Sequence, residues 1–228
     1  MIKKLLLTFI LFLAFKAYSQ ETSQTEIPLF DKIEVIGQYK VDIKKGEKNS
    51  IKFYGSSEDV SNVRFAVKNN TLKISSLKKI LEKGNSVRIV VTFTSLNKIL
   101  VTAGGSIYCS EVLSLDSIDI TCGSGSSVDI KIEINSFSAN VDKGSTISIS
   151  GSCKKMDIEA ASGGIFDAYE LVCDTAIVRA NSGGLAKVYV KKYLNAAAAA
   201  GGEISYRGSP TKLIPKKTLG GKIEMMSE

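Results

Sequence analysis

The sequence predicts an all-β protein, a right-handed parallel β-helix with coils of about 20 residues and a mixed or antiparallel N-terminal region. The first observation is a glycine that recurs seven times and is followed, three residues later, by an apolar or small residue. Successive glycines are separated by 21, 19, 19, 20, 18 and 19 residues. The pairs are Gly104/Ile107, Gly125/Val128, Gly144/Ile147, Gly163/Phe166, Gly183/Ala186, Gly201/Ile204 and Gly220/Ile223. A fixed period of this length indicates structural units stacked along one axis.

The second observation is an apolar alternation with period two on both sides of each glycine. In the unit around Gly144 the apolar positions are Phe137, Ala139, Val141, Ile147 and Ile149. Such alternation is typical of half-buried strands. Equivalent strands of consecutive coils would pair about 4.8 Å apart, and parallel crossovers favour the right hand. Five consecutive alanines, 196–200, have high helix propensity, but they occupy a strand position of the repeat, so we expect a strand there.

The N-terminal part follows a looser version of the same pattern. Apolar alternation flanks Asn69-Asn70, which predicts a β-hairpin because asparagine tolerates positive φ. We expect a loop at Lys78–Gly84. An antiparallel or mixed region over 20–96 would cover the exposed edge of the first coil. It would form one continuous domain with the β-helix repeats of 97–228.

Residues 1–19 have the pattern of a secretory signal peptide. Lys3 and Lys4 precede an apolar run, and Ala17-Tyr18-Ser19 places small residues at both specificity positions of a cleavage site. The run is too short for a comfortable transmembrane helix, and no second long apolar run occurs in the sequence. We therefore expect a mature chain from Gln20, without an integral membrane segment, in the periplasm, at the cell surface or outside the cell.

Charge and composition disfavour several classes of partner. After removal of the signal peptide, 27 basic side chains face 23 acidic ones, a net charge of +4. These charges are interspersed, so no nucleic-acid partner is expected. The sequence has no histidine and no CxxC motif, which argues against zinc and haem sites. We expect no metal and no cofactor.

The four cysteines raise the question of disulfides, because exported proteins meet oxidising conditions. Leu113, Ile134, Cys153 and Cys173 occupy nearly equivalent places, nine or ten residues after their glycines. Cα atoms one coil apart fall within the range that a disulfide spans, so Cys153 and Cys173 are a disulfide candidate. Stacked free thiols that fill the core are the alternative. Cys109 and Cys122 lie on different inward columns and are expected to be buried thiols.

Acidic side chains form two outward columns, each with two aspartates separated by two coils. They are Asp119 with Asp157, and Asp129 with Asp167. The implied spacing of about 9–10 Å is too wide for a retaining glycosidase and at the edge of the inverting range. Histidine is missing as a base, and the serine-rich turns form no nucleophile elbow. Solvated carboxylates are therefore favoured, and we assign no catalytic residue.

Aromatic side chains give the most suggestive surface feature. Tyr169 and Tyr189 each lie six residues after a glycine on adjacent coils, so they are expected to stack side by side near a corner. Arg179 and Arg207 lie on the same stretch of the chain. A flat aromatic surface with polar neighbours suits the face of a sugar. The alternative is that each tyrosine packs on its neighbour and shields the strand. Our candidate ligand-binding residues are Tyr169, Tyr189, Arg179 and Arg207.

The order of several short motifs resembles one family. These are FDKIEVIG (30–37), VDIKKG (41–46), the repeated Gly-Ser or Gly-Gly turns, and ISYRGSP (204–210) followed by Gly220-Gly221. They resemble the GIN-domain family of "putative auto-transporter adhesin" head proteins, common among exported proteins of Bacteroidetes-type bacteria. The resemblance covers roughly residues 27–225 and implies a β-helical, exported protein that is not an enzyme. The chain departs from the family pattern at Asp142-Lys143-Gly144 and in its four cysteines.

Three functions remain open on the sequence. The favoured one is an adhesin-like protein that presents a repetitive surface to glycan or to a cell-envelope protein. A polysaccharide-active enzyme is the second, by analogy with other β-helices. A structural or assembly protein of the periplasm is the third. The sequence makes no prediction of oligomeric state.

Overall fold

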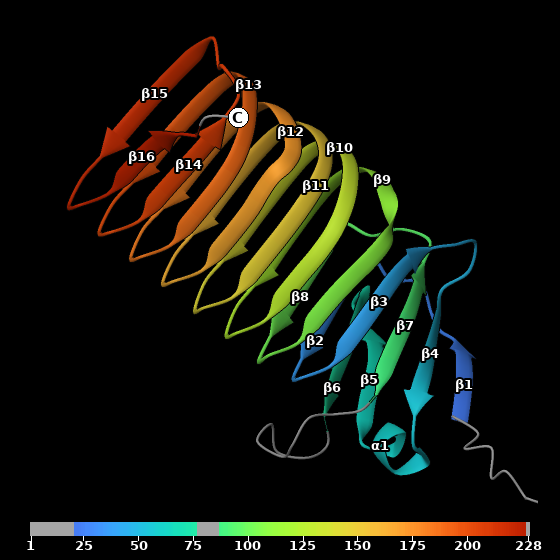
Figure 1. Ribbon diagram of the computed structural model, residues 1–228. Coiled ribbons are helices and arrows are strands. Elements are labelled where there is room, and N and C mark those ends of the chain that lie inside the picture. The colour runs from blue at the N-terminus through green and yellow to red at the C-terminus, as the bar shows by residue number, and fades with distance from the viewer. Residues whose placement is uncertain (1–20, 77–86, 227–228) are drawn as a thin grey trace, which may run out of the picture.

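The computed structural model describes residues 21–76 and 87–226. The signal peptide of 1–19 and most of the expected loop at Lys78–Gly84 lie outside the described residues. The structure is a parallel β-solenoid of about seven turns, with coils of about 19 residues and an antiparallel N-terminal part (Figure 1). The fold class predicted from the repeat is confirmed.

The strands of the regular coils run in order along the solenoid axis (Figure 1). They are β9 (Ser106–Cys122), β10 (Ser127–Val141), β11 (Thr146–Ala160), β12 (Ile165–Ala180), β13 (Leu185–Ala198), β14 (Glu203–Arg207), β15 (Lys212–Lys217) and β16 (Lys222–Met225). Each pairs in parallel with the equivalent strand of the next coil. The alanine run confirms that register overrides helix propensity, because 196–198 belong to β13.

The recurring glycine is the second central residue of a tight turn. In the turn of 161–164, Ser162 has φ 49° and Gly163 has φ 72°, and the amide of Gly164 donates to the Ala161 carbonyl at 2.8 Å. Two consecutive positive φ values with this bond define a type I′ turn. The Gly163 amide then donates to the Ser182 carbonyl in the next coil at 3.3 Å. The turns are therefore bonded to one another along the axis, as the strands are.

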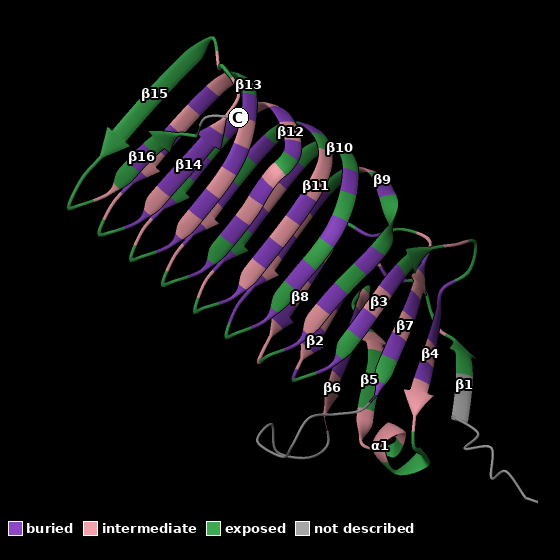
Figure 2. Ribbon diagram, viewed as in Figure 1, coloured by how far each residue is buried: buried purple, intermediate pink, exposed green. Residues whose placement is uncertain are grey.

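The core runs the length of the solenoid and is made of the inward residues of each strand. Figure 2 shows buried residues alternating with exposed and intermediate ones along β10 to β13. Phe137 and Phe166 stack within this core with ring centroids 6.0 Å apart. Two serines replace the second glycine of the turn in their coils, and both are buried: Ser126 and Ser145. The Oγ of Ser145 accepts a hydrogen bond from the Ser126 amide at 3.2 Å.

The N-terminal part contains both antiparallel and parallel pairs. Its elements are β1 (Glu21–Glu26), β2 (Lys32–Ile36), β3 (Lys40–Lys45), β4 (Ser50–Gly55), α1 (Ser57–Ser61), β5 (Val63–Lys68), β6 (Thr71–Ser76), β7 (Arg88–Phe93) and β8 (Lys98–Thr102). The predicted hairpin joins β5 and β6, which are antiparallel, with positive φ at Asn69 and Asn70. Strand β4 is antiparallel to both β1 and β7.

Strands β2 and β3 differ from the expected cap. They form a coil of the solenoid itself, because β2 pairs in parallel with β6 and β8, and β3 pairs in parallel with β7 and β9. The first coil in the sequence therefore lies inside the stack, between coils that come later in the chain (Figure 1). Sequence periodicity could not show this, because it does not state which coil lies beside which.

Candidate functional site

A groove opens on the face of the solenoid that is formed by the residues directly after each glycine turn. Asp129, Ser148 and Asp167 are successive Cα partners on β10, β11 and β12, so the predicted acidic column exists. These residues line a cavity of about 380 Å³. Its full lining is Asp129, Ser148, Ile149, Ser150, Asp167, Tyr169, Glu170 and Arg207.

The shape of the groove depends on an irregular stretch of β12. The pairing of β11 with β12 shifts between Ser148/Ser150, where three steps on β12 oppose two on β11. On the other side, the pairing of β12 with β13 shifts between Ala168/Val172. Residues 169–171 therefore have no partner on β13. A bulge of this kind re-aims side chains, and it brings Tyr169 and Glu170 to the cavity wall.

Arg207 closes the groove from two coils away. Its guanidinium carbon lies 4.4 Å from the centre of the Tyr169 ring, a cation–π distance. Lys187, on the coil between, donates to the Asp167 carboxylate at 3.0 Å. The Nε atom of Arg207 is buried and has no hydrogen-bond partner among the described residues. A buried donor without an acceptor costs free energy, so this atom is a position where a ligand acceptor would be favoured.

The groove can bind a ligand that both donates and accepts hydrogen bonds. The carboxylates of Asp129, Asp167 and Glu170 accept, while Arg207 donates. The three acidic side chains outnumber the two basic ones, Arg207 and the ion-paired Lys187, so the net charge around the groove is negative. The described residues contain no cluster of three or more histidine, cysteine or acidic side chains that could hold a metal.

Two of the four sequence-predicted binding residues line the groove, and a third, Tyr189, is the Cα partner of Arg207. Tyr169 and Arg207 line the groove, whereas Tyr189 and Arg179 are not among its lining residues. The Cα partner of Tyr189 is Val172 rather than Tyr169, because the bulge in β12 shifts the register. The strand register therefore does not place the two tyrosines side by side. Tyr189 instead covers Gly208, where an added Cβ would lie 2.7 Å from the ring.

Arg179 lies on a different face of the solenoid. It comes before the turn at Ser182-Gly183, whereas Tyr169 comes after the preceding turn. Its guanidinium donates to the Asp157 carboxylate at 2.6 Å. Asp119 lies in the same outward column as Asp157, two coils away, and forms an ion pair with Lys98 at 3.3 Å. This second acidic column is therefore a row of ion pairs on the surface.

Sequence reasoning did not include Glu170, Ser148 or Ser150 in the site. The repeat lengths held a signal for the bulge that exposes Glu170. The unit from Gly163 to Gly183 has 20 residues and the next has 18, against 19 for most others. An extra residue in a coil that must match its neighbours has to leave the register somewhere. The sequence alone does not say at which residue.

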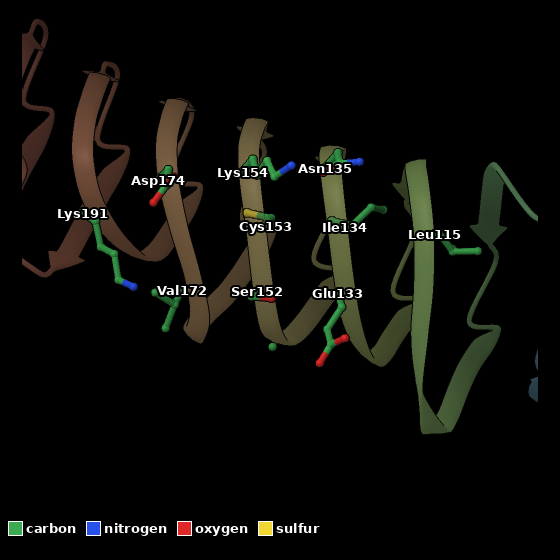
Figure 3. A pocket seen from close by; sticks show the side chains of 11 residues that line it. Leu115, Glu133, Ile134, Asn135, Ser152, Cys153, Lys154, Val172, Asp174 and Lys191 are labelled. Carbon is green, nitrogen blue, oxygen red and sulfur yellow. The ribbon is translucent and has the colours of Figure 1, made fainter.

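A second cavity, of about 550 Å³, lies farther along the same strands. Figure 3 shows its lining side chains spread over adjacent coils, with Cys153 between the coil of Ile134 and that of Asp174. Cys153 and Cys173 are direct Cα partners, as their spacing predicted. Leu115, not Leu113, is the partner of Ile134 in this column, because β9 carries two extra residues before it.

The two thiols of this column interact. A hydrogen bond between the two thiols raises the pKa of Cys153 and lowers the pKa of Cys173. The other two thiols are buried, as expected. Burial raises the pKa of Cys109, and burial raises that of Cys122 to about 11. The disulfide between Cys153 and Cys173 stays a prediction at this point.

Comparison with known proteins gives a family and a fold. The model of the family described as "putative auto-transporter adhesin, head GIN domain" matches residues 29–210. A crystal structure of a "putative adhesin" from Bacteroides fragilis NCTC 9343 is 21% identical, with a TM-score of 0.84, covering 92% of this chain and 98% of that one. A "putative adhesin" from Parabacteroides distasonis ATCC 8503 is 15% identical, with a TM-score of 0.74, covering 91% and 97%.

A third solved structure has a different description. It is a "putative lipid binding protein" from Parabacteroides distasonis ATCC 8503, 18% identical, with a TM-score of 0.66, covering 92% of this chain and 98% of that one. At these identities the likeness concerns the fold. No curated protein matches the chain. Among the described residues, no helix has the length and apolar character needed to cross a membrane.

Proposed function

The chain belongs to the family described as "putative auto-transporter adhesin, head GIN domain", and from this premise we propose that it is an exported, non-catalytic protein that binds glycan in the groove of β10, β11, β12 and β14. The observation that carries the proposal is the buried, unpartnered Nε of Arg207 in a cavity that three acidic residues, Asp129, Asp167 and Glu170, also line. A sugar hydroxyl satisfies both kinds of group, because it accepts from the guanidinium and donates to a carboxylate.

The charge of the groove narrows the class of glycan. Asp129, Asp167 and Glu170 outnumber the cations, and Lys187 already holds Asp167. An acidic polysaccharide would place its carboxylates among these acids and would be repelled. We therefore propose a neutral glycan or one that carries an amino sugar. Such a ligand suits a protein at the cell envelope.

Tyr169 has a different role from the open platform expected of it. The guanidinium of Arg207 lies over its ring, so the tyrosine positions the arginine and leaves less ring surface for a sugar. Recognition would then depend mainly on hydrogen bonds to the carboxylates and the guanidinium. Replacing the ring with phenylalanine keeps the stacking surface and is expected to keep binding.

The test is binding of the mature protein, from Gln20, to a panel of neutral, amino-sugar and acidic glycans. We expect saturable binding that weakens about tenfold or more, roughly 1.4 kcal/mol, in Arg207→Gln and Tyr169→Ala. Tyr108→Ala is the matched control, because Tyr108 is an exposed aromatic next to Asp129 in the same outward column but outside the groove. Binding that survives in Arg207→Gln would place the site elsewhere.

Two other results would point to the remaining functions. Turnover of a polysaccharide that is lost in Asp129→Asn or Asp167→Asn would show an enzyme. No binding to any glycan, together with a mass that rises with protein concentration in light scattering, would favour a structural or assembly role.

A further inference from the structure

We propose that Cys153 and Cys173 are a redox-active pair that closes into a disulfide between two neighbouring coils, through the cavity that exposes Cys153. The pairing is geometric. Both residues are Cα partners on β11 and β12, and partnered strands lie about 4.8 Å apart, inside the Cα range of about 4.4–6.8 Å for disulfides. Both side chains are buried in the same inward column.

The cavity gives an oxidant access to one sulfur of the pair. Cys153 lines the 550 Å³ cavity and is 6% exposed, whereas Cys173 is fully buried and does not line it. In Figure 3 the Cys153 sulfur points toward the neighbouring coil, which carries Val172 and Asp174. Two basic and two acidic side chains also line the cavity: Lys154, Lys191, Glu133 and Asp174.

The reaction is a thiol–disulfide exchange with an oxidised protein or small-molecule disulfide. The Cys153 sulfur attacks one sulfur of the oxidant and releases the other as a thiolate, which leaves a mixed disulfide on Cys153. The Cys173 sulfur then attacks Cys153 and releases the second oxidant thiolate. Two thiol protons leave the pair, and its two electrons reduce the oxidant to two thiols.

The other two cysteines are not expected to react. Cys109 donates to the Glu111 carbonyl at 3.4 Å, and Cys122 to the Thr146 carbonyl at 3.7 Å. Cys122 pairs with Val101 and Val141 rather than with a second cysteine. Neither Cys109 nor Cys122 lines the cavity of Cys153. They therefore serve as internal controls in the same chain.

The test is to expose the folded mature protein to oxidised glutathione, alkylate it in denaturant without reductant, and digest it with trypsin. The sequence separates the pair, because Cys153 lies in peptide 144–154 and Cys173 in peptide 156–179. Cys109 and Cys122 share peptide 99–131. We expect 144–154 linked to 156–179, and 99–131 carrying two alkyl groups. Four alkylated cysteines, or a link involving peptide 99–131, would overturn the proposal.

Two single variants test the order of attack. Cys173→Ser leaves the accessible sulfur without its partner, so we expect a stable glutathione adduct on Cys153. Cys153→Ser leaves only the buried sulfur, so we expect no adduct on Cys173. An adduct on Cys173 in place of Cys153 would contradict the assigned entry route. In the unaltered protein, oxidation is expected to raise the urea midpoint by about 1 M, and reductant should reverse the rise.

Discussion

Replacing either glycine of one turn by alanine separates two causes of the glycine repeat. Gly163 has φ 72° and open space where a Cβ would point. A Cβ on Gly164 would lie 2.6 Å from the carbonyl carbon of Val141 and closer still to its oxygen. Gly163→Ala therefore changes only the backbone preference, whereas Gly164→Ala pushes the coil away from the one before it.

The expected losses in the free energy of unfolding differ enough between the two variants to be measured. An alanine in the left-handed region costs about 1–2 kcal/mol, and the stiffer unfolded chain returns about 0.4–1 kcal/mol, so Gly163→Ala should lose about 1 kcal/mol. In Gly164→Ala the overpacking costs about 1–3 kcal/mol. The Val141 carbonyl also loses its bond from the Ala161 amide, 2.9 Å in the structure, for about 1–3 kcal/mol more.

The assay is urea unfolding of the mature protein followed by far-ultraviolet circular dichroism, with the midpoint and slope fitted for each variant. Gly183→Ala and Gly184→Ala repeat the comparison one coil later, where a Cβ on Gly184 would lie 2.8 Å from the Ala161 amide nitrogen. Equal losses for both members of a pair would refute the reasoning. So would a larger loss at the residue with open space.

Three further predictions concern the core, the buried serines and one surface ion pair. Phe166→Ala removes a fully buried ring that stacks on Phe137 and should lower the free energy of unfolding by about 3–5 kcal/mol, as measured in urea. Ser145→Ala leaves a buried amide of the adjacent turn without its acceptor and should cost about 1–3 kcal/mol in the same assay; an unchanged midpoint would contradict it. The hydrogen bond from Lys192 lowers the pKa of Asp174, so this pair stabilises the fold above the ordinary aspartate pKa and stops doing so as pH falls through the lowered value. Lys192→Gln should move the Asp174 pKa upward in an NMR titration, and no movement would show that the ion pair is not formed.

The repeat could be predicted from the sequence because its causes are local. A residue with positive φ followed by glycine forms each turn, and the alternation on either side marks the strands. The column of Asp129 with Asp167 follows from counting residues from the glycine. Cys153 and Cys173 lie nine and ten residues after their glycines and come into register through the bulge in β12. Both columns are present in the structure.

The candidate groove could be predicted only in part, because it depends on an interruption of the repeat. Counting placed Tyr169 beside Tyr189, but the bulge in β12 moves Tyr169 out of that register. Its actual neighbour is Arg207, two coils away. Arg179 keeps its place in the repeat, yet the turn at Ser182-Gly183 puts it on another face. The spacing of the glycines gives the length of each coil, but it does not give the position at which a bulge accommodates an extra residue.

The inner position of β2 and β3 has a consequence for how the protein reaches its folded state. A solenoid built in sequence order could grow by adding one coil at a time to a finished edge. Here the coil that is synthesised first has neighbours on both sides that come later in the chain, β6 and β7 on one side and β8 and β9 on the other. One edge waits unpaired until residues up to 93 are available, and the other until residues up to 108. Contacts of such long sequence separation slow folding, so this first coil, rather than the regular stack, should set the pace.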